Sequence, residues 1–395
     1  MLAPRSYVTT LLLDVARTIL KRMRCGILLL ASAGCASPGD PPDERTALIT
    51  VNNVGGRVEV TAPSYTMNFA SSGILMPEHL IVGGSDVLGS DGCNTEALVG
   101  VATYPATRAT GGRQGIASRS TIERLIEGPL IAQVHVTYEV DYMCPTLQTL
   151  SGESFFTFFP SGRIVREDRG VRPSTTALRL STNCGCQDSD PPSNLYFTSF
   201  WAFDPNGAIE VDASGSATTG GQSRACTMYP NRAIGVAWNG ERTRIRPNTA
   251  SAHVFDWVAD ADVLEPFPQQ AFSAIQISTE ADQPTSRCGD ILAGLADQPI
   301  QIGGMLFGST GSAGIYEDTV VHRDAFVVAA VGDPIPPGFA ISMDLDGASH
   351  ATFSRHPAVD GDVALLQHEP NSNRLIVVFP HGLQLGDTIT IEPRF

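Results

Sequence analysis

Residues 132–140 read AQVHVTYEV, and their pattern decides the predicted fold. Apolar or aromatic residues occupy the even-numbered positions, and polar residues occupy the odd-numbered positions. Because successive side chains of a β-strand point to opposite faces of the sheet, this alternation indicates a strand with one buried and one solvent-facing side. The stretch therefore predicts a sheet that covers a hydrophobic core.

Strand patterns recur along the rest of the chain, and turn residues separate them. Gly, Asn, Asp and Pro at the intervening turns predict three hairpins, which comprise residues 48–61, 155–165 and 196–211. Helical spacing is confined to short segments, such as residues 120–127 and 290–296. The pattern favours an all-β protein.

Composition supports the same fold class. The chain of 395 residues contains 38 Gly and 27 Pro, and only 17% of its residues are charged, a profile of many short strands and turns. We therefore expect an antiparallel β-sandwich or supersandwich with a smaller C-terminal β-domain. The Gly-rich run at residues 303–312 predicts a main domain over residues 46–312 and a C-terminal domain over residues 313–395, and the Pro-rich segment 333–337 is an alternative boundary.

The N-terminal segment has the pattern of a signal peptide. Lys21, Arg22 and Arg24 precede the apolar run at residues 26–31, which is too short to span a membrane. This predicts a signal peptide over residues 1–34. Met23 is an alternative start, in which case residues 1–22 are not translated.

The residues that follow predict where the chain is held. Ser-Ala-Gly-Cys at residues 32–35 resembles the lipobox of bacterial lipoproteins, which implies that Cys35 carries a lipid. Residues 35–45 are rich in Pro and Asp and are typical of a flexible tether. We therefore expect an exported protein, anchored to a membrane of the bacterial cell envelope on its periplasmic or surface face. An ordinary secretory signal peptide is the alternative.

Charge and missing motifs exclude several classes of partner. Without residues 1–34 the chain has 21 basic and 40 acidic residues, a net charge of −19, which disfavours binding to phosphate backbones. It contains neither a P-loop nor a Gly-x-Gly-x-x-Gly motif. We expect no nucleic-acid partner and no nucleotide cofactor.

Cysteine content agrees with export. Six cysteines remain beyond Cys35, and an even number in an oxidising compartment predicts disulfides whose pairing the sequence leaves open. The six disulfide candidates are Cys93, Cys144, Cys184, Cys186, Cys226 and Cys288. Cys184 and Cys186 are separated by one residue, which is shorter than the usual spacing of zinc ligands and therefore favours disulfides to two different partners.

Three stretches point to one structural family. They are ILMPEHLIVGGSDVLG at residues 74–89, EGPL at residues 127–130 running into the strand that reaches Val140, and FFPSGRI at residues 158–164. Together they resemble the galactose-mutarotase-like β-supersandwich of carbohydrate-active bacterial proteins. The resemblance implies a large concave sheet and a sugar-related ligand, and it transfers no catalytic residue.

A few side chains are candidates for chemistry or binding. His135 and Glu139 lie four residues apart on the polar side of their strand, where they form a candidate acid–base pair or a solvated face. Tyr196 and Trp201 are candidates for stacking on sugar rings, or for the core. Asp344 and Asp346 supply oxygen ligands of the kind that a structural Ca²⁺ uses, although the spacing of an EF-hand is absent. No other cofactor is expected.

Two functions follow from these features. The tether and the missing catalytic motifs favour a lipid-anchored envelope protein that acts as a binding or structural β-module, with a polysaccharide or an envelope protein as its partner. The alternative is a carbohydrate-active enzyme, a polysaccharide lyase or glycoside hydrolase, with its site on a concave sheet. This second hypothesis depends on analogy with the fold.

Overall fold

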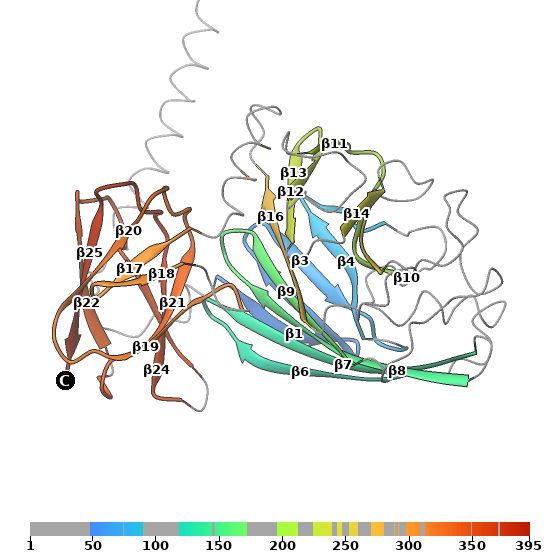
Figure 1. Cartoon of the computed structure of the whole chain (residues 1–395), viewed down its shortest axis with the longest axis horizontal. Helices are drawn as coiled ribbons and strands as arrows, with labels where there is room; N and C mark the ends of the chain where they lie inside the picture. Colours follow the sequence, from blue (N-terminus) through green and yellow to red (C-terminus); the bar gives the residue numbers. More distant parts are fainter. Residues whose placement is uncertain are drawn as a thin grey trace, which may run out of the picture. The chain divides into compact units, whose positions relative to one another are not determined.

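The computed structural model confirms an all-β fold made of several antiparallel sheets (Figure 1). Contacts divide the chain into residues 1–41 and residues 42–395, and all the described residues lie in the second unit. The structure describes residues 48–73, 75–89, 118–143, 147–171, 196–211, 224–238, 243–246, 253–259, 270–279, 288, 291, 298–308, 313–348, 350–369 and 372–395.

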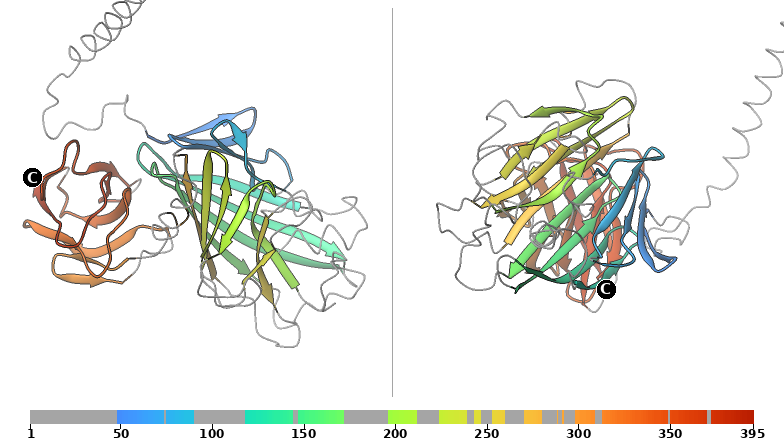
Figure 2. Two further views of the ribbon diagram at one scale, coloured as in Figure 1. Left: turned by 90° about the horizontal axis from the view of Figure 1, so that it is seen from above. Right: turned by 90° about the vertical axis from the view of Figure 1, so that its right-hand side faces the viewer.

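The largest sheet has eight strands in the order β11-β12-β13-β16-β9-β8-β7-β6. Its members are β6 (Ser118–Glu127), β7 (Ala132–Met143), β8 (Leu147–Phe158), β9 (Arg163–Val171), β11 (Ala208–Val211), β12 (Arg224–Tyr229), β13 (Arg232–Trp238) and β16 (Gln270–Ser278). The alternation at residues 132–138 is confirmed, because the even-numbered side chains are buried. Figure 2 shows the same strands from two further directions.

Two smaller sheets pack on the inner face of this sheet. One is a five-stranded meander formed by β1 (Thr50–Val54), β2 (Arg57–Ala62), β3 (Tyr65–Phe69), β4 (Pro77–Val82) and β5 (Ser85–Asp86). The other is formed by β10 (Tyr196–Phe203), β15 (His253–Ala259) and β14 (Thr243–Arg246). One hydrophobic core joins all three sheets, with Met67, Val136, Phe156, Trp201 and Phe255 among its members.

The β1–β2 hairpin is confirmed, and its turn explains why glycine is needed. Gly55 and Gly56 have φ values of 59° and 83°, which suit the tight turn of a two-residue hairpin but strain other residues. Gly152 has a different role. A Cβ atom at this position would lie 2.5 Å from the Tyr138 hydroxyl, so the absent side chain makes room for the tyrosine ring on the facing strand.

The residues from 298 onward form two further sheets. The five-stranded sheet has the order β18-β17-β20-β25-β22, and the four-stranded sheet has the order β19-β21-β24-β23, in which β19 and β21 run parallel. The strands are β17 (Ile300–Ile302), β18 (Met305–Phe307), β19 (Tyr316–Val321), β20 (Phe326–Ala330), β21 (Phe339–Asp344), β22 (His350–His356), β23 (Leu365–His368), β24 (Arg374–Phe379) and β25 (Thr388–Arg394). A second core lies between them, and it includes Val328, Met343, Phe379 and Ile389.

The proposed domain boundary at residue 312 stays a prediction. Strands β17 and β18 precede it in sequence and pair within the sheet that contains β20 and β25. A third buried cluster also combines side chains from both sides of it, among them Val165, Ile315 and Ile376.

A buried glutamine joins the two sets of sheets. The Gln367 side-chain oxygen accepts hydrogen bonds from the backbone amides of Leu130 and Ile131, at 2.7 and 2.9 Å. Its side-chain nitrogen donates to the Ile131 carbonyl oxygen at 3.1 Å. The Gln367 carboxamide thus pairs with backbone N–H and C=O groups just before β7, in the way that a peptide group of an adjacent strand would.

Two predictions of local structure were wrong. Residues 120–127 belong to strand β6 rather than a helix, because their pairing with β7 overrides the spacing of their apolar residues. Residues 196–211 do not form a hairpin. The Asp204 carboxylate accepts a hydrogen bond from the Asn206 amide and closes a turn, but β10 pairs with β15 and contacts Leu88, so β11 joins β12 in another sheet.

Candidate functional site

Two rows of side chains cross the solvent-facing side of the eight-stranded sheet. Strand register places Glu123, His135, Phe155, Glu167 and Phe272 in one row. The adjacent row contains Thr121, Thr137, Glu153 and Arg169. Within a row each residue comes from a different strand, and regular pairing holds strands β6 to β9 and β16 side by side. Sequence positions spread over about 150 residues therefore meet on one surface, which we call the β6–β9 face.

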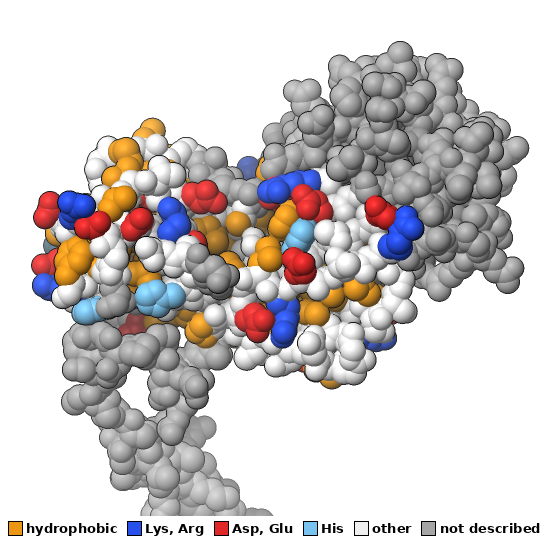
Figure 3. Space-filling model, turned by 90° about the horizontal axis from the view of Figure 1, so that it is seen from below, with side chains coloured by type: hydrophobic (Ala, Val, Ile, Leu, Met, Phe, Trp, Pro, Cys, Tyr) orange, Lys and Arg blue, Asp and Glu red, His pale blue; other side chains and the backbone are white. Residues whose placement is uncertain are grey.

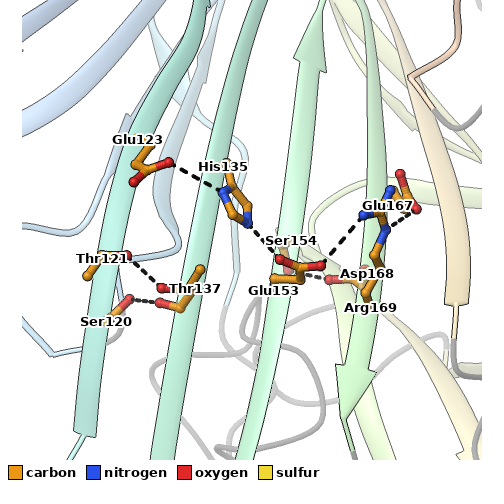
Figure 4. A network of polar contacts seen from close by, with 10 residues as sticks. All are labelled: Ser120, Thr121, Glu123, His135, Thr137, Glu153, Ser154, Glu167, Asp168 and Arg169. Atoms are coloured by element: carbon orange, nitrogen blue, oxygen red, sulfur yellow. Dashed lines mark hydrogen bonds and ion pairs between the residues drawn. The ribbon is translucent and has the colours of Figure 1, made fainter.

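His135 is the centre of a polar network on this face (Figure 4). Its Nε2 atom lies 2.9 Å from a carboxylate oxygen of Glu153, and its Nδ1 atom lies 3.8 Å from a carboxylate oxygen of Glu123. The His135 side chain is 15% exposed, Glu153 is 32% exposed and Glu123 is 66% exposed. The imidazole is therefore oriented by a half-buried carboxylate and reachable from solvent.

A basic residue extends the network across strand β9. Arg169 Nε donates a hydrogen bond of 2.6 Å to Glu167, and Arg169 Nη1 lies 3.6 Å from Glu153. The hydrogen bond to Glu167 is the main cause that raises the pKa of Arg169. Carboxylates, the guanidinium and the imidazole thus alternate from Glu123 to Glu167, and each charged group restrains its neighbour.

Phe155 gives the network an aromatic base. The rings of His135 and Phe155 are stacked, with centroids 4.1 Å apart and an interplanar angle of 4°. The Arg169 guanidinium lies 4.6 Å from the centroid of the same phenyl ring. Because β7 and β9 flank β8 on opposite sides, the Phe155 ring stands between the imidazole and the guanidinium. Packing of this kind fixes the orientation of His135.

The surface view shows the same arrangement from outside. Figure 3 looks at the molecule from the side of β6, β7 and β8, and a histidine there is bordered by acidic, basic and hydrophobic side chains. The face is chemically mixed and offers hydrogen-bond donors and acceptors together.

The predicted pair of His135 and Glu139 occupies the expected side of β7, but the two side chains bind different partners. Glu139 accepts a hydrogen bond of 2.8 Å from Arg119, and both of these side chains are at least half exposed. His135 instead contacts Glu153 and Glu123 across the strands. These cross-strand partners, together with Arg169, are the residues that the sequence prediction missed.

The aromatic candidates do not form a ligand platform in the part of the chain that the structure describes. Trp201 is fully buried, its Nε1 atom donates a hydrogen bond to the Ser273 hydroxyl at 2.9 Å, and its ring packs near Phe156 and Phe203. It is therefore a core residue, and the sugar-stacking prediction for it was wrong. The side chain of Tyr196 lies outside the described atoms.

Asp344 and Asp346 form a tight turn rather than a ligand set. The Asp344 carboxylate accepts a hydrogen bond from the Asp346 amide at 2.9 Å, and Asp346 forms an ion pair with Arg323 at 2.9 Å. Among the described residues, no group of three or more His, Cys, Asp or Glu side chains has the arrangement of a metal site. The predicted calcium site gains no further ligand here.

One of the expected disulfides is present. Cys226 and Cys288 are bonded, with Cα atoms 5.7 Å apart, and both residues are buried. Cys93, Cys144, Cys184 and Cys186 lie outside the described residues, as do Cys35 and the expected signal peptide. No helix in the described ranges is long and apolar enough to cross a membrane.

The fold and the site define the class of this protein: an all-β protein with several antiparallel sheets, the largest of which carries an ordered polar face. No protein-family model matches the chain, and no curated protein sequence is similar enough to count as a relative. Among solved structures, the chain is similar to heparan sulfate lyase HepC from Pedobacter heparinus, with a TM-score of 0.36 and 10% identity. The match covers 71% of this chain and 41% of the lyase, so the chain spans less than half of that protein.

Proposed function

We propose that this chain is a cell-envelope β-protein that binds a carbohydrate chain on its β6–β9 face. The observation that carries the proposal is the network of Glu123, His135, Glu153, Arg169 and Glu167, held on four paired strands beside the Phe155 ring. Carboxylates, imidazole and guanidinium groups supply the donors and acceptors that sugar hydroxyls require. Side chains on regular strands are better positioned for recognition than side chains on loops.

The accessibility of these groups favours an extended ligand. Glu123 is two-thirds exposed, and Glu153 is one-third exposed. A polymer that lies across the strands can contact both rows of the β6–β9 face at once, and each row contributes side chains from several strands. Several modest hydrogen bonds along one chain then add to a specific interaction.

Binding should depend on His135 and Glu153. In a titration of the full chain with a panel of bacterial and plant polysaccharides, we expect His135→Ala and Glu153→Gln each to weaken the binding of a positive ligand about tenfold, because each removes a hydrogen bond that involves a charged group. Glu139→Gln is the matched control, since Glu139 lies on the same face of β7 and pairs with Arg119 instead. Equal losses in all three variants would contradict the proposal, as would the absence of binding to every polysaccharide.

The same geometry supports a second candidate, a carbohydrate-active enzyme. A general base needs a third group that orients it, and Glu153 orients His135 while Arg169 restrains Glu153. Each polysaccharide that binds should therefore be incubated with the chain and tested for product, by the absorbance of unsaturated sugars and by an assay for reducing ends. Product that appears with the unmodified chain and disappears with His135→Ala would identify a lyase or hydrolase. Binding without product identifies a binding module.

Attachment to the envelope is the second part of the proposal. The basic, apolar and small-residue segments that end at Cys35, with a Pro-rich tether after them, support lipidation of that cysteine. In bacteria grown with a radioactive fatty acid, we expect the expressed chain to take up label and Cys35→Ala to remain unlabelled. Label in the Cys35→Ala chain would exclude this site of attachment.

A further inference from the structure

We infer that the β6–β9 face takes a glycan that carries positively charged amino groups, in preference to a neutral glycan and against one that carries carboxylates or sulfates. The inference rests on the proposed carbohydrate binding and adds the chemical class of the sugar. Three features of the face support it. Carboxylates are in excess, Arg169 is paired with carboxylates of the protein, and the carboxylate oxygens of Glu123 are exposed to solvent.

Carboxylates outnumber cations in the two rows. Glu123 and Glu153 supply two partly exposed negative charges, Glu167 supplies a third that is 3% exposed and bonded to Arg169, and Arg169 is the one Arg or Lys residue among the nine residues of these rows. Counted without His135, these residues carry a formal net charge of −2. A cationic group on the ligand reduces this excess, whereas an anionic group increases it.

Arg169 is already committed to protein carboxylates. It donates to Glu167 at 2.6 Å, lies 3.6 Å from Glu153 and covers the Phe155 ring at 4.6 Å. A sulfate or carboxylate on a ligand would have to share the guanidinium with these two protein carboxylates, whose negative charges repel it. The raised pKa of Arg169 has the same cause, since the adjacent carboxylates stabilise its charged form.

The carboxylates that face solvent are the accessible acceptors. Glu123 contacts His135 Nδ1 only at 3.8 Å and is 66% exposed, so its oxygens can accept hydrogen bonds from a ligand without loss of a short contact. Long-range charge acts in the same direction, because the chain has a formal net charge of −15 and repels anionic polymers. Local geometry and overall charge therefore select the same class of ligand.

The test compares three soluble probes of equal length with the full chain: an N-acetylglucosamine oligosaccharide, the same oligosaccharide with free amines, and a heparan sulfate oligosaccharide. At a pH where the amines are protonated, we expect the amine-bearing probe to bind about fivefold more tightly than the acetylated probe, the upper range for one partly exposed charge pair. Heparan sulfate should bind most weakly. Glu123→Gln and Glu153→Gln should lower the ratio of the two affinities toward one, and Glu139→Gln should leave it unchanged.

The outcomes separate the inference from the proposed function. Equal affinity for the acetylated and amine-bearing probes, or tightest binding of heparan sulfate, would overturn the inference and leave carbohydrate binding in place. A ratio that falls as much in Glu139→Gln as in Glu123→Gln would also overturn it, because the attraction would then belong to the acidic surface as a whole. If none of the probes or the panel polysaccharides binds, the proposed function itself is wrong.

Discussion

Replacement of Asp168 by alanine is expected to lower the free energy of unfolding by about 3–5 kcal/mol, the range observed when one partner of a buried ion pair is removed. Arg166 is fully buried on the inner face of β9, and its Nε atom lies 2.8 Å from the Asp168 carboxylate. The Ser154 hydroxyl also donates a hydrogen bond to this carboxylate. Without Asp168, the buried guanidinium loses this ion pair. Urea denaturation followed by circular dichroism measures the change.

Two further variants test the physical cause of this loss. In the unmodified chain the Arg166 guanidinium lies over the rings of Phe156 and Trp201. In the double variant Arg166→Met, Asp168→Leu, both charges are absent and apolar side chains take their place beside these rings. We expect this double variant to be more stable than Asp168→Ala. Glu392→Ala is the surface control, because its ion pair with Arg394 is half exposed and should contribute less than about 1 kcal/mol. Similar losses for Asp168→Ala and Glu392→Ala would show that the buried pair has no special role.

Alkaline pH is expected to destabilise the fold by about 4 kcal/mol between pH 9 and pH 11. Burial raises the pKa of Tyr65, Tyr138 and Tyr229 far above the ordinary value of about 10. The folded chain therefore keeps these hydroxyls protonated, while the unfolded chain ionises them above pH 10. Each tyrosine then favours the unfolded state by about 1.4 kcal/mol at pH 11. Urea midpoints measured at both pH values give the difference.

Single Tyr→Phe variants show whether these three residues are responsible. Tyr65→Phe removes one titrating group and the hydrogen bond of its hydroxyl to the Phe159 carbonyl oxygen. Its stability at pH 9 should fall, but the further loss between pH 9 and pH 11 should be about one third smaller than in the unmodified chain. An unchanged loss in all three single variants would assign the alkaline transition to other groups.

Local patterns predicted the strands well, and they predicted strand order poorly. Alternation in residues 132–138 identified β7 because burial on one side of a sheet is visible in a single strand. The turn residues at 204–207 also predicted the turn that the Asp204 carboxylate closes. They could not predict that β10 pairs with β15 on one edge and contacts Leu88 on the other. Pairing between strands far apart in sequence decides such topology. The helical spacing of residues 120–127 misled for the same reason, since β7 supplies their partner.

The site was predicted in part. The polar side of β7 indicated His135, but Glu139, its neighbour on the same strand, binds Arg119. The groups that contact His135 come from β6 and β8, and a prediction of Glu123 and Glu153 needs the register of both hairpins. The sequence signal available for these partners was the presence of charged residues at solvent-facing positions of the adjacent strands. Trp201 shows the opposite case, because a large aromatic residue fits a core as well as a binding surface.

The contact made by Gln367 has a consequence for synthesis of the chain. The Leu130 amide finds its partner 237 residues later in the sequence, close to the C-terminus. At translation rates of about 5–20 residues per second, the ribosome needs roughly 10–50 s to make the segment between them. During that interval the backbone that enters β7 lacks this hydrogen-bond acceptor, and the buried cluster around Leu130 and Ile131 still lacks Ile376 and Val378. Until the last quarter of the protein has been made, the backbone amides of Leu130 and Ile131 must therefore be hydrogen-bonded to water or covered by a chaperone.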